Sequence, residues 1–207
     1  MKAMLKDAAI LFVITLIAGL ALGFVYDLTK EPIKAQEVKK KNEAYRSVFP
    51  EAESFEVISD KPDLAPEDVS AYVQEQGLDV SVEEIATAAD KASSTLGYVI
   101  TVTDHEGYGG DITFAIGVKE DGSVSGVSIL SISETAGLGM RADEVLVPQM
   151  PGKDLGSEIS YTKSGNATGN EVDAISGATI TTNAFVNGMN AGRIVFTDLL
   201  LAGKGAV

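Results

Sequence analysis

The chain has 207 residues, of which 45% are hydrophobic, enough for one globular core with accessory elements. It contains no cysteine, which excludes disulfides, thiolate metal sites, iron–sulfur ligation and a lipid-modified cysteine within this sequence. The single histidine, His105, lies in a turn-like run and argues against an imidazole metal centre or a Ser/His/Asp site. The net charge of −14 argues against nucleic acid as a partner, because a phosphate backbone would be repelled.

An uncharged and almost wholly apolar run extends from residue 8 to residue 26. It is about long enough to cross the hydrocarbon core as a helix, which needs ~20 residues. The alternative is a cleaved signal peptide, whose apolar region usually has only ~7–15 residues. The length favours an uncleaved anchor. We therefore predict that residues 1–28 form an N-terminal tail and a single transmembrane helix in the cell membrane.

Charge alone leaves the orientation of this anchor open. Two lysines precede the apolar run, and five lie in the segment directly after it: Lys2 and Lys6, then Lys30, Lys34, Lys39, Lys40 and Lys41. A positive-inside count points the large domain toward the cytoplasm, but long domains translocate regardless of nearby charge.

Residues 29–50 are predicted to form a charged juxtamembrane helix, with Thr29 as its N-cap and Pro32 early in its first turn. Residues 51–95 are rich in Asp and Glu and show no catalytic pattern. Within them, Pro66 and the capping box that starts at Ser81 predict two short helices. We therefore expect an acidic helical insertion.

Residues 96–207 show the pattern of an α+β domain. Apolar residues alternate from Tyr98 to Val102 and from Ile112 to Val118, and a third run covers residues 124–131. Glycine-rich turns join these runs, so three strands are expected to form an antiparallel meander. A final helix with an apolar face should pack across the sheet. The predicted architecture is a transmembrane helix followed by an antiparallel sheet domain packed with helices.

The block Asp173-Ala-Ile-Ser-Gly-Ala-Thr179 directly precedes this last helix. Gly177 and Ala178 leave room for a bulky group near the backbone, and a helix N-terminus favours an anion. Hydroxyls of Thr179, Thr181 and Thr182 surround the same point. Taken alone, the block fits a phosphate site or an ordinary Ser/Thr-rich helix cap.

Three separated motifs together resemble the FMN-binding domain family. They are GYGGDI at residues 107–112, ETAGLG at residues 134–139 and DAISGAT at residues 173–179. Within the family, the chain is most similar to the G subunits of the Rnf electron-transport complex, relatives of the C subunit of the sodium-pumping NADH:quinone oxidoreductase. The ETAGLG loop departs from the family's usual form, since Ala136 stands where proline is typical.

The resemblance implies that FMN is joined to Thr179 through a phosphoester bond. It implies further cofactor contacts by Tyr108, Glu134, Thr135, Leu138, Gly139, Arg141, Asp173, Ser176, Gly177, Ala178 and Thr182. Three of these have structural alternatives: Tyr108 could simply fill its turn, Leu138 could be a core residue, and Glu134 could be a solvated loop acid. No catalytic residue and no metal ligand are expected.

The same resemblance implies an electron carrier in a membrane complex coupled to sodium or proton movement, and not a catalyst on its own. The expected partners are the other subunits, a flavin transferase for maturation, and the lipid bilayer. Family analogy places the flavin domain on the extracytoplasmic side. Two alternatives remain: the equivalent subunit of the quinone-reducing sodium pump, and a membrane-anchored structural subunit without flavin.

Overall fold

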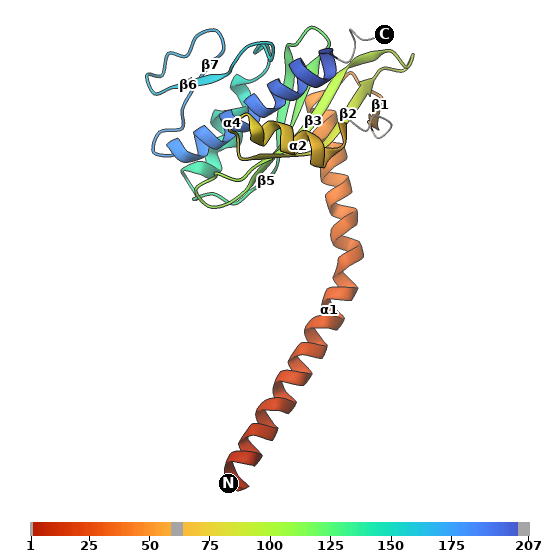
Figure 1. The fold of residues 1–207 in the computed structure, drawn as a ribbon, viewed down its shortest axis with the longest axis vertical. Coiled ribbons are helices and arrows are strands. Elements are labelled where there is room, and N and C mark those ends of the chain that lie inside the picture. The colour runs from red at the N-terminus through yellow and green to blue at the C-terminus, as the bar shows by residue number, and fades with distance from the viewer. Residues whose placement is uncertain (1, 59–63, 203–207) are drawn as a thin grey trace. The chain divides into compact units, whose positions relative to one another are not determined.

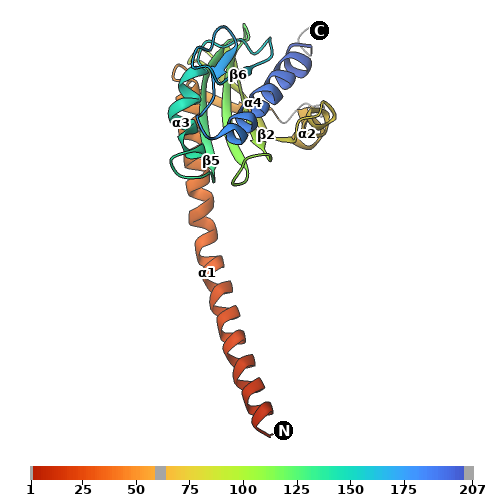
Figure 2. The same ribbon diagram turned by 90° about the vertical axis from the view of Figure 1, so that its left-hand side faces the viewer.

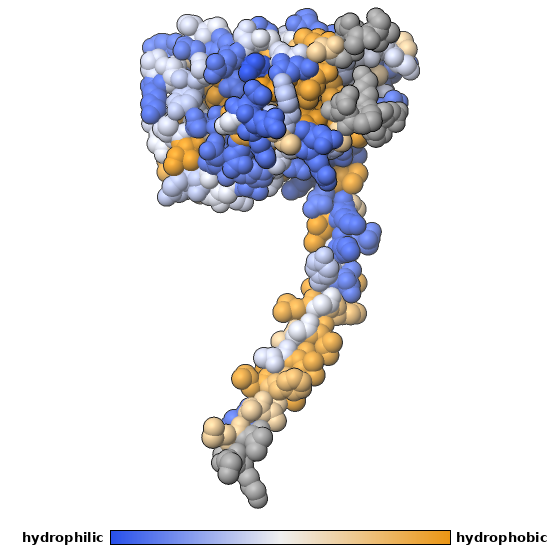
Figure 3. Space-filling view, viewed as in Figure 1, coloured by the Kyte–Doolittle hydropathy of each residue, from blue (hydrophilic) through white to orange (hydrophobic). Residues whose placement is uncertain are grey.

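The computed structural model describes residues 2–58 and 64–202, and the chain divides into two compact units, Met1–Asn42 and Glu43–Val207. Helix α1 (Lys2–Val48) starts in the first unit and ends in the second. Its N-terminal part presents exposed apolar side chains, visible as the orange stretch of the helix in Figure 3. Within the described residues, α1 is the one helix long and apolar enough to cross a membrane.

The expected new helix start at Thr29 is wrong, because α1 runs through this point without a break. The Thr29 hydroxyl donates to the carbonyls of Val25 and Tyr26, at 2.9 and 3.2 Å, as a threonine inside a helix does. Pro32 also lies inside the helix. Proline removes one backbone donor, and the flanking Ala, Lys, Glu and Gln residues are strong enough helix formers to continue the helix around it.

The second unit is built on a five-stranded antiparallel sheet in the order β1-β2-β3-β4-β5. The strands are β1 (Ser54–Val57), β2 (Val80–Ala89), β3 (Thr95–Asp104), β4 (Ile112–Lys119) and β5 (Val124–Ile132). Strands β3 to β5 confirm the predicted meander. After them come short turns η2 (Gly139–Arg141), α3 (Ala142–Val145) and η3 (Val147–Gln149), then a parallel pair, β6 (Ser160–Thr162) and β7 (Glu171–Asp173).

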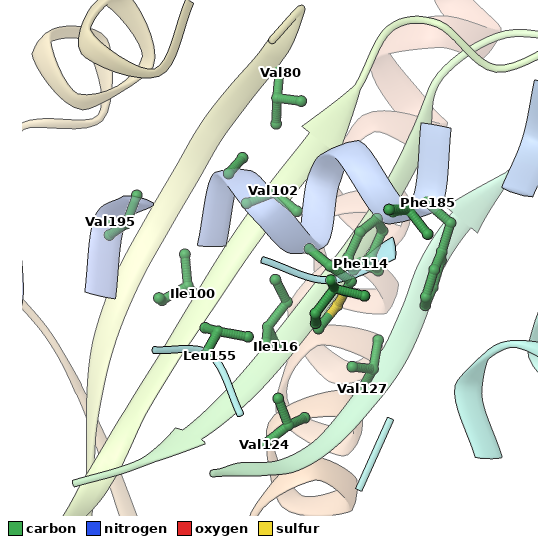
Figure 4. Close-up of a cluster of buried hydrophobic side chains, with 14 of the residues drawn as sticks. Val80, Ile100, Val102, Phe114, Ile116, Val124, Val127, Leu155, Phe185 and Val195 are labelled. Atoms are coloured by element: carbon green, nitrogen blue, oxygen red, sulfur yellow. The ribbon is translucent and has the colours of Figure 1, made fainter. Parts of the chain in front are cut away.

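The last helix packs across one face of the sheet, as predicted (Figure 1). It comprises α4 (Thr179–Ile194), which continues as the wider turns of η4 (Val195–Leu201). The ring of Phe185 stacks on Phe114 of β4 with centroids 4.8 Å apart, in the cluster shown in Figure 4. A Cβ atom at Gly188 would lie 2.5 Å from the Phe114 ring, so the small residue lets α4 approach the sheet closely.

The opposite face of the sheet is also buried, which the sequence patterns do not predict. The last turn of α1 contributes Tyr45 and Val48, and together with Phe49 they form a second apolar cluster against β2, β3 and β4. The Tyr45 hydroxyl donates to Glu84 at 2.7 Å and also bonds Thr101 at 2.9 Å. Figure 2 shows the sheet between this end of α1 and α4. The sheet is therefore the middle layer of three.

The predicted acidic helical insertion needs one correction. Helix α2 (Pro66–Glu75) starts where expected, but residues 80–89 form strand β2, so the Ser81 capping box starts no helix. Val80 and Val82 are buried on the α4 side, and the strand pairs with both β1 and β3. A four-residue capping pattern is weak local information, and pairing on both edges overrides it. Residues 51–95 thus supply two strands of the main sheet.

Candidate functional site

The three sequence motifs, far apart along the chain, meet at one pocket of about 470 Å³. The turn after β3, the loop after β5 and the start of α4 each contribute to its walls. Its lining residues are Tyr108, Glu134, Thr135, Leu138, Gly139, Gly177, Ala178, Thr179, Ile180 and Thr181. Eight of these ten are among the residues predicted from the resemblance.

The first two loops are joined through Glu134. One oxygen of its carboxylate, Oε1, accepts a hydrogen bond from the Tyr108 backbone N–H at 2.8 Å. A Cβ atom at Gly109 would collide with the Ser133 carbonyl oxygen, so the two backbones are in direct contact. The Tyr108 side chain is 70% exposed, so it does not fill its turn. The Glu134 interaction thus fixes the turn and leaves the ring free at the pocket.

The second loop contacts the start of α4 closely at two glycines, Gly139 and Gly177. A Cβ atom at Gly139 would lie 2.6 Å from the Thr181 hydroxyl and 2.8 Å from Glu134 Oε2. Gly177 has φ +80°, a backbone conformation that residues with a side chain rarely adopt. A Cβ atom at Gly177 would also lie 3.2 Å from the Leu138 side chain. Leu138 itself is 41% exposed, which shows that it is not a core residue.

Helix α4 begins at the pocket without a side-chain cap. Its N-cap residue is Ala178, and no side chain of the described residues forms a cap hydrogen bond there, so the ordinary-cap interpretation of this block is wrong. The N–H groups of the first turn have no partner within the helix, and they carry the positive end of its dipole. An anionic group is therefore favoured at this point.

Thr179 is the first residue of α4 and is half-buried, whereas Thr181 and Thr182 are 1% and 0% exposed. Among the described residues, no hydrogen-bond partner engages the Thr179 hydroxyl. Thr182 instead donates to the Ala178 carbonyl at 2.9 Å and accepts from the Ile175 N–H at 3.1 Å. Thr179 and Thr181 both line the pocket without a hydroxyl partner in the described part of the chain, and Thr179 is the more exposed of the two.

Glu134 also carries an unmet hydrogen-bonding capacity. Its second oxygen, Oε2, is buried and has no hydrogen-bond partner within the described part of the chain. A buried acceptor without a partner is costly, and a ligand that donates a hydrogen bond would satisfy it. The exposed apolar side chains of Tyr108, Leu138 and Ile180 line the same pocket. The pocket therefore fits an amphipathic ligand that combines a flat apolar ring, hydrogen-bond donors and an anionic end.

Four predicted residues lie outside the pocket lining. Arg141 is exposed, with its Nε 3.9 Å from a carboxylate oxygen of Glu144. Asp173 uses its carboxylate to accept the Ala167 N–H at 3.1 Å. Ser176 is exposed beside the pocket, and Thr182 is buried behind it.

The prediction omitted Ile180 as a contact and placed Thr181 only in the vicinity. Both line the pocket because they occupy the first turn of α4, where residues next to the N-cap face the same opening. The available signal was that both residues directly follow Thr179 in the sequence.

Two protein-family models match the chain and identify the class of protein. A family model described as "FMN-binding domain" matches residues 107–192, which contain all three pocket motifs. A second model, described as "RnfG N-terminal region", matches residues 1–48. The chain is thus a flavin-binding-domain protein with an N-terminal helix of a known type.

Relatives that match over nearly the whole chain identify the family to which it belongs. The chain is 31% identical over 200 residues to the G subunit of the Na(+)-translocating ferredoxin:NAD(+) oxidoreductase complex of Acetobacterium woodii, covering 96% of this chain and 94% of the relative. It is 27% identical to the G subunit of the ion-translocating oxidoreductase complex of Methanosarcina acetivorans, covering 92% and 93%. The chain belongs to the G-subunit family of ion-translocating oxidoreductase complexes. The relatives and the apolar α1 together indicate membrane anchoring.

A solved structure supports the fold. The crystal structure of Shewanella oneidensis NqrC matches with a TM-score of 0.56 and 18% identity, covering 78% of this chain and 88% of that one. The predicted α+β architecture is confirmed.

Proposed function

We propose that this chain carries electrons in a membrane-bound, ion-translocating ferredoxin:NAD oxidoreductase complex of the Rnf type, with FMN joined to Thr179 through a phosphoester bond. The observation that carries the proposal is the pocket in which three loops meet at the uncapped start of α4, with Thr179 among its lining residues. The names of the full-length relatives support the complex. The other subunits of that complex are the partners.

Each part of the pocket has a role toward the cofactor. Gly177 and Ala178 leave the Thr179 hydroxyl uncrowded, and the free N–H groups of α4 stabilise the phosphate charge. Leu138 and Ile180 supply apolar contact, and the unpaired oxygen of Glu134 accepts a hydrogen bond. Bound FMN supplies reversible electron transfer at its ring, while the protein supplies position, electrostatic setting and access.

The test of attachment is the intact mass of the full-length chain produced together with a flavin transferase. Ester formation between the Thr179 hydroxyl and the phosphate adds one FMN and releases one water. Thr179→Val should abolish both this increment and the flavin fluorescence of the band on a denaturing gel. Thr168→Val, the same change at an exposed threonine outside the block, is the matched control and should keep both. A fluorescent Thr179→Val band would refute the assignment.

We also propose that the flavin domain faces the extracytoplasmic side. The absence of cysteine allows a direct test, because single cysteines can be introduced at exposed positions on either side of the apolar run. Lys163→Cys should react with a membrane-impermeant maleimide in intact cells, and Lys6→Cys should react only after lysis. The reverse pattern would place the domain in the cytoplasm.

A second candidate function is the equivalent subunit of the sodium-pumping NADH:quinone oxidoreductase, which the likeness to NqrC favours. That likeness shows the fold alone at 18% identity, whereas the full-length relatives are G subunits. Purification with an affinity tag on the native complex separates the two, because the co-purifying subunits differ.

A further inference from the structure

The segment that leads into Thr179 is held from behind by two side chains. The first is Gln149, at the end of η3. Its Oε1 accepts the Asp173 backbone N–H at 2.7 Å, and its Nε2 donates to the Asp173 carbonyl at 3.1 Å and to the Val145 carbonyl at 2.6 Å. A single side-chain amide thus pairs both backbone groups of Asp173.

These two backbone groups lie on the free edge of β7. The next residue, Ala174, donates its N–H to the Thr162 carbonyl of β6 at 2.8 Å. Since backbone groups alternate in direction along a strand, the groups of Asp173 point away from β6. Gln149 therefore occupies the place that a third strand would take.

The second side chain is Thr182, one turn into α4 and fully buried. Its hydroxyl accepts the Ile175 N–H at 3.1 Å and donates to the Ala178 carbonyl at 2.9 Å. The Ala178 N–H in turn donates to the Ile175 carbonyl at 3.0 Å, which closes the turn. Ile175 is 1% exposed, so its side chain anchors the turn in the core.

The backbone from Asp173 to Ala178 is thus fixed on its inner side, while Ser176 and Gly177 stay exposed on its outer side. Thr182 is fully buried and Gln149 does not line the pocket. Neither side chain is placed to touch a group attached at Thr179, so both can act on such a group only through the backbone.

We propose that Gln149 and Thr182 are positioning residues that form an internal clamp on the attachment segment, and that this clamp keeps the ring of the attached flavin in the pocket. The inference rests on the proposed function. A phosphoester tether leaves the ring on a flexible chain, so its concentration at the pocket depends on how firmly the anchor is held. The clamp acts on ring position and not on ester formation.

The test uses the full-length, flavinylated chain in detergent micelles and measures flavin content by mass and ring exposure by iodide quenching. Thr182→Val keeps the side-chain shape and removes both hydrogen bonds, and Gln149→Met keeps the length and removes the amide. Both should retain full flavin content. Loss of about 1 kcal/mol of hydrogen bonding corresponds to roughly a fivefold change in an equilibrium constant, so we expect a several-fold larger quenching constant and lower flavin anisotropy.

Two variants serve as controls. Thr182→Ser keeps the hydroxyl and should restore quenching to nearly the parent value. Phe196→Leu, a core change at the far end of the last helix, destabilises the domain without touching the clamp, so its quenching should stay unchanged. If Thr182→Val does not fold, Gln149→Met, at a half-buried side chain, decides the outcome.

Three results have distinct meanings. Unchanged quenching and anisotropy in folded, flavinylated clamp variants would overturn the clamp. Loss of attachment in these variants alone would also overturn it, because the side chains would then serve ester formation. An unmodified parent chain would refute the proposed function instead.

Discussion

Asp104, the last residue of β3, is a buried carboxylate that should make the stability of the domain fall as pH rises. It lies on the core side of the sheet and is 0% exposed. One oxygen accepts the Glu106 N–H at 2.8 Å, and the other has no partner among the described residues. Burial raises the pKa of Asp104 to about 7; the negative charges of Glu106 and Asp79 add to this, and His105 opposes it.

The Asp104 carboxyl binds its proton more tightly in the folded chain than in the unfolded chain. The folded chain keeps this proton up to about pH 7, while the unfolded chain loses it near the ordinary pKa of 3.8. The stabilising contribution is therefore complete below about pH 4 and is lost as pH rises to about 7. At 1.36 kcal/mol per pKa unit the full difference is roughly 4 kcal/mol, of which about 3 kcal/mol falls between pH 5 and pH 8.

Asp104→Asn removes the titration and keeps an acceptor for the Glu106 N–H. We expect the variant to gain about 3 kcal/mol of unfolding free energy relative to the parent between pH 5 and pH 8. The assay is urea unfolding of the full-length chain in a nonionic detergent, followed by far-ultraviolet circular dichroism at both pH values. Asp121→Asn is the control: the Ser123 hydroxyl and N–H lower the pKa of this exposed carboxylate, so it stays ionised across this window and its difference from the parent should be equal at pH 5 and pH 8. An equal parent-to-variant difference at both pH values would refute the reasoning.

Two further predictions concern packing and a third concerns buried hydrogen bonds. Gly139→Ala places a methyl group 2.6 Å from the Thr181 hydroxyl, so it should cost about 1–3 kcal/mol in urea unfolding and raise flavin quenching, whereas Ala136→Ser in the same exposed loop should change neither. Phe185→Ala removes the stacked ring against β4 and should cost about 3–5 kcal/mol; a loss below 1 kcal/mol would contradict its place in the core. Tyr45→Phe removes two hydrogen bonds to side chains of β2 and β3 and should cost about 1–2 kcal/mol, and an unchanged urea midpoint would show that these bonds contribute nothing.

Much of the architecture was accessible from local patterns. The apolar run of α1, the alternation in β3 to β5 and the amphipathic last helix each arise from interactions between residues close in sequence, so their periods can be read directly. The three site motifs were recognised through their resemblance to the FMN-binding domain family, since the residues of the last block taken alone also fitted an ordinary helix cap. Eight pocket residues followed from them.

Tertiary structure decided what depends on partners distant in the chain. Residues 80–89 form a strand because they pair with β1 on one edge and β3 on the other. Tyr45 is a core residue because it packs against the second face of the sheet. The threonines illustrate the same limit: Thr179 and Thr182 look equivalent in sequence, yet one reaches the pocket and the other is buried behind it. Their directions depend on where the helix meets the sheet, and no local pattern contains that information.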